Sequence, residues 1–543
     1  MQATMMNLPL SLNHLLERAG TLFSGNEIVS RLPDKTLRRH SYGEFYRRTR
    51  SLASALQGLG LQKGDRVATL CWNHHAHLEC YFGIPAAGGV MHTLNLRLSP
   101  DEIGWIAGNA KDRFLVIDDV LLPLYRQIEH LYKFEKVIVF SFSGARVAPE
   151  FTDYDALLAA ASPDTFTYAP HDENDPVAMC YTSGTTGRPK GVVYSHRSTI
   201  LHTLVASLGD FWGLRGTDVV LPVTPMFHAN CWGMPYGAVM MGVKLVFPGP
   251  HLHPDDLLDL IKQEPPTLAL GVPTIWMSLI QTYDAAQADG SPNKGRWALP
   301  SGMKSLVGGA AVPESLIRAF DRHGIWILQG WGMTETSPVC TISYPRAELR
   351  GADADERYRR AAMAGVPVPL VDLRVRGDDG TDQAWDGKSV GEIQVQGPFI
   401  TASYHEVPVD AEKFTDDGWL RTGDVASVDE LGFVRITDRT KDLIKSGGEW
   451  ISSVDLENAL MAHPAVAEAA VIAIPDEKWS ERPLACVVLK PGQVATPQDF
   501  NTHLLKHSFA KWQLPERYEF IDAVPRTSTG KFWKMKLREQ FKA

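Results

Sequence analysis

The chain has 543 residues, of which 44% are hydrophobic and 22% are charged, and its formal net charge at pH 7 is −9. This composition is typical of a globular protein and argues against intrinsic disorder and against a strongly basic nucleic-acid-binding protein. The length predicts more than one domain. The sequence has no run of 18 apolar residues, no signal-peptide pattern at its start and no CxxC pair among its six cysteines. We therefore expect a cytoplasmic protein without an integral membrane segment or a disulfide framework.

Short apolar runs alternate with helix-like segments through the first two thirds of the chain. The runs at 137–140, 243–247, 268–270 and 325–328 read as strands. The segment 313–320 begins with proline and has the apolar spacing of an amphipathic helix. Strands that alternate with helices of this length predict βαβ units and largely parallel sheets, so the fold class is α/β.

The pattern changes from residue 371 onward. Segments such as 392–396 and 433–436 alternate polar and apolar residues and are separated by Gly-Asp turns. This alternation is typical of short strands separated by turns. We expect a small β-rich subdomain here.

A second change, at 438–442, predicts a domain boundary. It is followed by a glycine pair, a helix-like stretch from Ser452 and a buried strand at 469–474. The segment from residue 438 to residue 543 is long enough to form a small α+β domain. The predicted organisation is an N-terminal domain of residues 1–437 and a C-terminal domain of residues 438–543.

A loop rich in glycine and hydroxyl groups, residues 181–191, joins two predicted strands. Its glycines let backbone N–H groups converge on an anion, its hydroxyls add donors, and its lysine adds positive charge, so it suits a polyphosphate. It differs from the Walker pattern, because Pro189 precedes the lysine and Gly191 follows it. A polar surface turn is the alternative, but the order of these residues between two buried strands argues against it. The residues assigned to phosphate binding are Thr182, Ser183, Gly184, Thr185, Thr186, Gly187 and Lys190.

With this loop and the segments 225–232 and 445–453, the sequence resembles the adenylate-forming enzymes, which include acyl-CoA synthetases, luciferases and peptide-synthetase adenylation domains. It is most similar to the medium- and long-chain fatty-acyl-CoA ligases and the related methylmercaptopropionate-CoA ligases. The resemblance implies a large N-terminal domain of stacked sheets with helices and a small mobile C-terminal domain. It also implies ATP, Mg²⁺ and coenzyme A as cofactor and co-substrates.

The glycine-rich segment 306–311 is expected to be a strand that ends in small residues. The segment 329–335 is expected to follow another strand end, where open α/β sheets place their ligands. Trp331 offers a face to adenine, Thr334 a donor to the α-phosphate, and Glu335 a hard oxygen for Mg²⁺, with Thr182 as the second metal ligand. The family more often has tyrosine where Trp331 stands. The other nucleotide-binding residues implied by the resemblance are Gly309, Gln329 and Gly330.

Further residues take their roles from the resemblance. Asp424, just after a turn glycine, is expected to accept hydrogen bonds from the ribose, and Arg439 helps to hold the nucleotide. Lys441 stands at the family's hinge position. A lysine near the end of a chain is usually a solvated charge, but Lys531 matches the family lysine that reaches the α-phosphate and the substrate carboxylate across the domain cleft.

The acid and coenzyme A are assigned to other side chains. The resemblance places His228 beside the reacting carboxylate, although a lone histidine is more often a packed core residue. It places Trp232 at the mouth of the acyl tunnel. Lys445 and Trp450, which flank the glycine pair 447–448, are assigned to coenzyme A. The histidines and cysteine of 74–80 match no standard zinc spacing, so we expect the start of a structural helix there.

The predicted activity is an AMP-forming acid–thiol ligase with Lys531, Glu335, Thr334 and His228 as catalytic residues. The expected acid is a medium-chain fatty acid, followed by long-chain and short thioether acids, and an aryl acid is less favoured. Two other classes stay open, namely an adenylating enzyme that uses another acyl acceptor and a non-catalytic nucleotide-binding protein. The expected partners are small molecules; nucleic acid is not expected, and a homodimer is left open.

Overall fold

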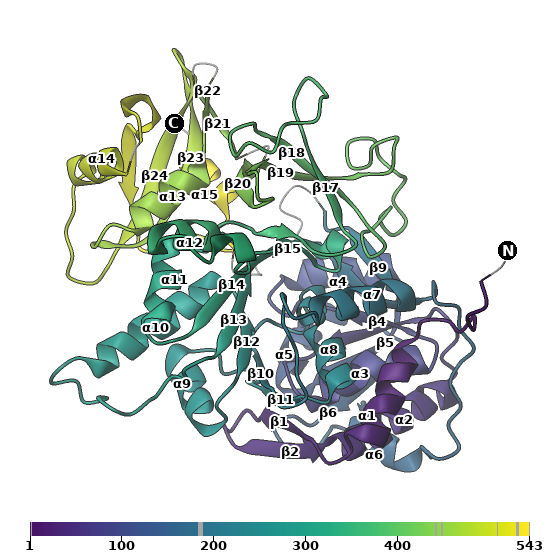
Figure 1. The fold of residues 1–543 in the computed structure, drawn as a ribbon. Coiled ribbons are helices and arrows are strands. Elements are labelled where there is room, and N and C mark those ends of the chain that lie inside the picture. Colours follow the sequence, from purple (N-terminus) through teal and green to yellow (C-terminus); the bar gives the residue numbers. More distant parts are fainter. Residues whose placement is uncertain are drawn as a thin grey trace.

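The computed structural model describes residues 1–543 except 2, 183–187, 440–441, 447–448, 508, 528–530 and 542–543. Figure 1 shows a large body of two sheets with helices, and the C-terminal elements form a smaller unit beside it. No helix among the described residues has the length and apolar character needed to cross a membrane.

The first sheet has nine strands among the described residues, in the order β16-β15-β14-β13-β12-β10-β11-β1-β2. Neighbours from β14 to β1 are parallel, whereas β2, β15 and β16 join antiparallel. The strands are β1 (Glu27–Arg31), β2 (Leu37–Ser41), β10 (Val219–Pro222), β11 (Lys244–Phe247), β12 (Leu268–Gly271), β13 (Lys304–Gly308), β14 (Trp326–Gly332), β15 (Val339–Ile342) and β16 (Val366–Pro367).

The second sheet has seven described strands in the order β7-β6-β5-β3-β4-β8-β9, all parallel except the antiparallel pair β8–β9. The prediction of largely parallel sheets is therefore confirmed. The strands are β3 (Arg66–Leu70), β4 (Val90–Thr93), β5 (Asp112–Asp118), β6 (Lys136–Phe140), β7 (Thr152–Asp153), β8 (Pro176–Tyr181) and β9 (Gly191–Ser195).

One hydrophobic core joins the two sheets through a central layer of helices, because buried residues of both sheets and of these helices belong to the same cluster. The helices are α1 (Leu12–Leu22), α2 (Tyr42–Gly58), α3 (His75–Ala86), α6 (Tyr154–Ala160), α7 (His196–Ala206) and α8 (Met234–Met241). A second cluster covers the other face of the nine-stranded sheet with α9 (Pro254–Gln263), α10 (Pro273–Gln287), α11 (Glu314–Asp321) and α12 (Ala354–Ala361). A third covers the seven-stranded sheet with α4 (Pro100–Ala110) and α5 (Leu122–Ile128). The helix expected at 313–320 is α11, which begins directly after Pro313.

The β-rich subdomain is an antiparallel sheet of β17 (Asp372–Arg376), β18 (Gly391–Gln396), β19 (Leu420–Val428) and β20 (Val434–Arg439). Because β20 pairs with β19 as far as Arg439, residues 438 and 439 belong to this sheet although we placed them beyond the domain border. The border itself stays a prediction.

The C-terminal unit has a sheet and a core of its own, formed by residues such as Leu456, Val471 and Phe500. Its strands are β21 (Ile444–Ser446), β22 (Glu449–Ile451), β23 (Val466–Asp476), β24 (Ser480–Leu489) and β25 (Arg517–Phe520), and its helices are α13 (Ser453–Met461), α14 (Pro497–Lys506) and α15 (Lys534–Phe541). Helix α13 begins after the N-cap Ser452, as the sequence predicted.

Two local expectations were wrong. The segment that begins at Gln329 does not follow a strand end, because β14 continues to Gly332 and pairs with β15 across a bulge at Trp331 and Gly332. Asp424 does not follow a turn glycine, since Gly423 and Asp424 both lie inside β19. Gly423 has a φ of +75° within that strand, a conformation that glycine adopts at little cost.

Candidate active site

A cavity of about 430 Å³ lies between the carboxyl ends of β13 and β14, the base of the β8–β9 loop, strands β19 and β20, and Lys531. Segments far apart in the sequence, from Thr182 to Lys531, therefore meet here, at the edge where open parallel sheets bind ligands. The predicted site residues that line the cavity are Thr182, Lys190, His228, Trp232, Gly309, Gly330, Trp331, Thr334, Glu335, Arg439 and Lys531.

The remaining predicted residues fall into three groups. Asp424 and Gln329 are buried next to lining residues. Lys445 and Trp450 lie on the β21–β22 hairpin and line a different hollow. The residues outside the described part of the chain are Ser183, Gly184, Thr185, Thr186, Gly187 and Lys441.

The two ends of the predicted phosphate loop, residues 181–191, are held together by hydrogen bonds. Thr182 donates its N–H to the carbonyl of Lys190 at 3.0 Å, and Lys190 donates its N–H to Thr182 Oγ1 at 3.0 Å. The Lys190 ammonium lies 4.9 Å from the centre of the Tyr404 ring, a cation–π contact. These contacts close the loop at its base and keep the lysine at the cavity.

Glu335 is held by neighbours that, among the described residues, leave one of its carboxylate oxygens without a protein partner. Tyr404 donates its hydroxyl to Glu335 Oε1 at 2.7 Å, and Thr401 donates its N–H to the Glu335 carbonyl at 2.8 Å. The short 3₁₀ turn η3 (Thr334–Thr336) that carries the glutamate is fixed by the Tyr194 hydroxyl, which donates to the Thr334 carbonyl at 2.7 Å. A buried carboxylate that no described lysine or arginine pairs with suits a divalent cation.

Trp331, Asp424 and Arg439 form a contiguous polar group. The indole Nε1 of Trp331 donates to Asp424 Oδ2 at 2.9 Å, and Arg439 Nε lies 3.2 Å from Asp424 Oδ1. Strand pairing puts Arg439 directly opposite Asp424. A tyrosine at position 331 has no N–H at this point, so the tryptophan gives the carboxylate an additional hydrogen bond.

Glycines keep the floor of the cavity flat. A Cβ atom on Gly308 would lie only 2.7 Å from the Gly330 carbonyl oxygen, so a side chain there would push β13 and β14 apart. Gly309 has a φ of +84°, and Lys531 Cε lies 3.9 Å from the position of its Cβ. Both positions therefore require glycine, one for close approach and one for its backbone conformation.

Lys531 reaches the cavity from the C-terminal unit. Burial is the main cause that lowers the pKa of its ammonium from 10.5 to about 8; the charge of Arg439 lowers it further, and Asp424 and Glu335 raise it in part. The site therefore holds a cation that gains stability when an anion binds beside it.

His228 lies beside Lys531 at the cavity and is partly exposed. Burial and the positive charges of Lys531 and Arg97 lower its pKa to about 3, so the imidazole is neutral at physiological pH. It can donate or accept a hydrogen bond, but it is not a cation there.

The turn η2 (Ala229–Gly233), which follows His228, has an unusual left-handed backbone. Ala229, Asn230, Cys231 and Trp232 have φ values of +42°, +52°, +53° and +57°, and Gly233 has +81°. Positive φ in non-glycine residues costs free energy and is concentrated at functional sites. This turn directs Trp232 into the cavity, where its side chain is largely buried.

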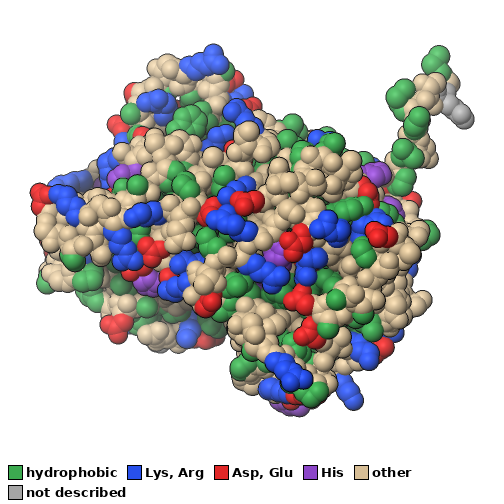
Figure 2. Space-filling view, turned by 90° about the horizontal axis from the view of Figure 1, so that it is seen from below, with side chains coloured by type: hydrophobic (Ala, Val, Ile, Leu, Met, Phe, Trp, Pro, Cys, Tyr) green, Lys and Arg blue, Asp and Glu red, His purple; other side chains and the backbone are tan. Residues whose placement is uncertain are grey.

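Most of the charged side chains that line the cavity are positive. Five cationic side chains and one carboxylate line it in the part of the chain that the structure describes, namely Arg188, Lys190, Lys413, Arg439, Lys531 and Glu335. On the face of the molecule shown in Figure 2, by contrast, basic and acidic side chains are interspersed. A local surplus of cations inside an acidic protein suits a polyphosphate anion.

The sequence reasoning missed Arg188, Lys413 and Tyr404, which also line the cavity. Arg188 stands inside the phosphate loop, and its charge alone was a signal. Lys413 and Tyr404 come from an irregular segment between β18 and β19, where neither periodicity nor a motif indicated a role.

The hairpin assigned to coenzyme A lies away from this cavity. The Lys445 ammonium is 4.3 Å from the centre of the Trp450 ring. Both residues line a hollow of about 1070 Å³ between the hairpin and strands β17 to β19. Their predicted role thus requires a different arrangement of the C-terminal unit.

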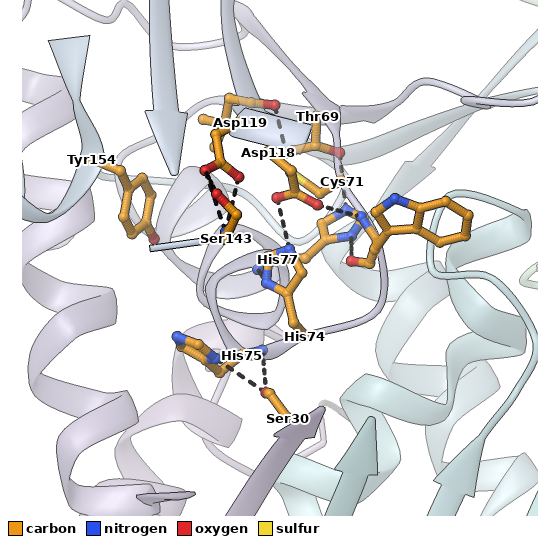
Figure 3. A network of polar contacts seen from close by, with 12 residues as sticks. Ser30, Thr69, Cys71, His74, His75, His77, Asp118, Asp119, Ser143 and Tyr154 are labelled. Carbon is orange, nitrogen blue, oxygen red and sulfur yellow. Dashed lines mark hydrogen bonds and ion pairs between the residues drawn. The ribbon is translucent and has the colours of Figure 1, made fainter. Parts of the chain in front are cut away.

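The histidine-rich segment begins a helix, as predicted, and its polar groups bond to one another (Figure 3). Single ligand atoms of Cys71, His74 and Asp118 lie within 4.8 Å of one another, close enough to suggest a metal site. However, His74 Nε2 is 2.8 Å from Asp118 Oδ1, Trp72 donates its N–H to Asp118 Oδ2 at 2.8 Å, and His77 donates its N–H to His74 Nδ1 at 3.3 Å. Since these lone pairs are used, the group fixes the start of α3 to the end of β5.

Comparison with known proteins gives matches along nearly the whole chain. The family model described as AMP-binding enzyme matches residues 17–405, and the model of the AMP-binding enzyme C-terminal domain matches residues 455–531. The chain is 48% identical to a long-chain-fatty-acid–CoA ligase of Thermus thermophilus, over 99% of this chain and 97% of the relative. It is 42% identical to a 3-methylmercaptopropionyl-CoA ligase of Ruegeria lacuscaerulensis, over 100% of this chain and 99% of the relative. The crystal structure of the anthranilate CoA ligase AuaEII with anthranoyl-AMP superposes with a TM-score of 0.85 at 25% identity, covering 100% and 99% of the two chains.

Proposed function

The chain belongs to the AMP-binding enzyme family, and from this premise we propose that it is an ATP-dependent acyl-CoA ligase. It activates a carboxylic acid as the acyl-adenylate and then transfers the acyl group to the thiol of coenzyme A, with release of pyrophosphate and AMP. The observation that carries the proposal is that Lys531, the base of the phosphate loop and Glu335 line one cavity.

In the first half-reaction a carboxylate oxygen attacks the α-phosphorus of ATP, and pyrophosphate leaves. A carboxylic acid is already ionised at neutral pH, so no general base is needed. The protein must bring two anions together and offset the charge that develops. Lys190 and Arg188 face the phosphates, Arg439 and Asp424 hold the ribose side, and Lys531 lies where it can contact both the α-phosphate and the acid.

The residues present also fit a magnesium ion. Glu335 offers a buried carboxylate oxygen without a described protein partner, and Thr182 Oγ1 accepts one hydrogen bond from Lys190 and keeps a second lone pair. We assign these two side chains to the metal, which would neutralise the phosphate oxygens when bound. Tyr404 orients the carboxylate for this role.

The second half-reaction requires the C-terminal unit to move. Lys531 occupies the cavity in this arrangement, whereas Lys445 and Trp450 lie elsewhere, so both groups cannot act at once. We propose a rotation about Lys441 that withdraws Lys531 and brings the hairpin to the adenylate. The thiol of coenzyme A then attacks the acyl carbonyl.

We propose a medium-chain fatty acid as the substrate. The acyl side of the cavity is apolar, with Trp232, Met333 and Val339 among its lining residues. The two relatives named above act on a long-chain acid and on a short thioether acid, and a medium-chain acid lies between these lengths. The 42% identical relative favours 3-methylmercaptopropionate as the second candidate.

A panel of acids tests the proposal. The purified chain, ATP, Mg²⁺ and coenzyme A are incubated with straight-chain acids from C2 to C18, aryl acids and 3-methylmercaptopropionate, and AMP and the CoA thioester are measured. We expect both products in equal amounts, with a maximum at medium chain length. AMP without thioester would point to another acyl acceptor, and the absence of both products with every acid would refute the ligase assignment.

A further inference from the structure

A buried ion pair in the C-terminal unit lies close to Lys531 but has no place in the chemistry above. Lys534 Nζ is 2.8 Å from Glu457 Oε1, and the two side chains are 11% and 8% exposed. Lys534 also donates to the hydroxyl of Ser453. Because a buried ion pair rarely adds much stability compared with apolar residues, its presence suggests a role in specifying one arrangement.

The hydroxyl of Ser453 continues this contact into the neighbouring sheet. Ser453 donates its Oγ–H to Asp438 Oδ2 at 2.5 Å and its N–H to the same oxygen at 3.0 Å. Beside it, Ser452 Oγ donates to the Thr437 carbonyl at 2.6 Å. Lys534, Ser453 and Asp438 thus form a relay of hydrogen bonds from α15 through the first turn of α13 to β20.

In the sequence, the two ends of the relay lie on opposite sides of Lys441, the predicted hinge residue. Asp438 precedes Lys441 and lies in β20, which pairs with β19 of the large body. Ser453, Glu457 and Lys534 follow Lys441 and belong to the C-terminal unit. A rotation about Lys441 therefore separates Ser453 from Asp438 and breaks these hydrogen bonds.

Each end of the relay is also attached to the active site. Asp438 is followed by Arg439, which lines the cavity and pairs with Asp424 at 3.2 Å. Lys534 is the first residue of α15 and stands three positions after Lys531. In this arrangement the relay is formed and Lys531 lines the cavity, so breaking the relay would remove a contact that joins α15 to the large body.

We propose that Lys534, Ser453 and Asp438 form a latch that holds the C-terminal unit in the adenylate-forming arrangement and opens before the thioester-forming step. The three are positioning residues, since none contacts the cavity. This inference rests on the proposed two-step ligase activity. According to this proposal the relay supports one half-reaction, adenylate formation, and not the other. A purely structural ion pair does not distinguish between the two half-reactions.

Ser453→Ala is the sharpest variant, because it removes the hydroxyl at the centre of the relay and keeps every charge. Adenylate formation is measured as acid-dependent exchange of pyrophosphate into ATP, and the second step as thioester formation from synthetic acyl-adenylate and coenzyme A. We expect at least a fivefold fall of the first rate, with the second unchanged or increased. Equal losses in both half-reactions, or no change in either, would overturn the latch.

Two further variants separate the latch from a loss of folding. Lys534→Met combined with Glu457→Gln removes both charges of the ion pair and leaves the buried Asp438 as the remaining carboxylate of the relay. We expect the same change in the ratio of the two rates. Arg435→Ala is the matched control, since Arg435 bridges β20 and α13 to Asp455 at 2.7 Å but is 52% exposed. Exposed ion pairs contribute little, so the control should keep the wild-type ratio. Melting temperatures identify any variant that fails to fold.

A distance measurement tests the latch without activity. All six native cysteines are buried, so spin labels can be placed selectively at Leu208→Cys on the body and Leu505→Cys in α14, both at exposed positions. In the ligand-free protein we expect one dominant distance, and Ser453→Ala should add a second population. An unchanged distance distribution in the variant would contradict the latch, whereas a wild-type protein that makes neither product would contradict the proposed function alone.

Discussion

The lowered pKa of Lys531 leads to a specific pH dependence of the first half-reaction. The ammonium has to be protonated to offset the charge of the α-phosphate and the carboxylate, and its pKa in the unliganded site is about 8 instead of 10.5. Since kcat/KM reports the ionisation of the free enzyme, the kcat/KM for ATP should fall as the pH rises through 8. From pH 7 to pH 9 the protonated fraction, and with it kcat/KM, falls about tenfold.

The lowered pKa of Lys531 also gives the free-energy cost of burying its ammonium group. A lowering from 10.5 to about 8 corresponds to roughly 3 kcal/mol of unfavourable free energy for the protonated form below pH 8, which disappears as the pH rises above this value. Binding of the ATP phosphates offsets this cost, so the pKa rises in the complex. Saturating ATP should therefore move the alkaline limb of kcat above that of kcat/KM.

Acid-dependent exchange of pyrophosphate into ATP, followed from pH 6 to pH 10, checks this prediction without a contribution from the thiol of coenzyme A. Lys531→Arg keeps a charge throughout this range, so its alkaline limb should vanish whatever its absolute rate. Lys531→Ala should lower the rate about 100- to 1000-fold, as the loss of other charge-stabilising donors does. A wild type without an alkaline limb, or a Lys531→Ala variant that retains it, would contradict the assignment of this limb to Lys531.

Two further predictions concern the metal and the glycine floor. Glu335→Gln should raise the Mg²⁺ concentration needed for half-maximal pyrophosphate exchange at least tenfold. Tyr404→Phe removes only the hydrogen-bond donor to Glu335 Oε1 and should raise this concentration less. Equal effects of the two variants would show that the carboxylate does not bind the metal. Gly308→Ala, whose Cβ would lie 2.7 Å from the Gly330 carbonyl, should lower the melting temperature and raise the KM for ATP, and a variant with both values unchanged would contradict the close packing of β13 and β14.

The sequence by itself was sufficient for the class of fold and for the residue types of the site. Alternating apolar runs and helix-like segments predicted the parallel sheets, because burial on both faces leaves a continuous apolar strand. The phosphate loop could be proposed from the sequence because its glycines, hydroxyls and lysine are contiguous. Local order carries this information, so no tertiary contact was needed to find it.

Only the tertiary structure decided how far burial shifts the pKa values of the site residues and which neighbouring residues complete the site. The continuation of β14 through Trp331 depends on its pairing with β15, and the bulge in β19 depends on its pairing with β18. No local sequence pattern specifies either pairing. Tyr404 and Lys413 reach the cavity only because an irregular segment folds back onto it. The neutral His228 and the lowered pKa of Lys531 result from burial that no local pattern encodes. Likewise the relay from Lys534 to Asp438 joins residues 96 positions apart. The packing of the C-terminal unit against β20 brings them together, and the sequence around either residue does not.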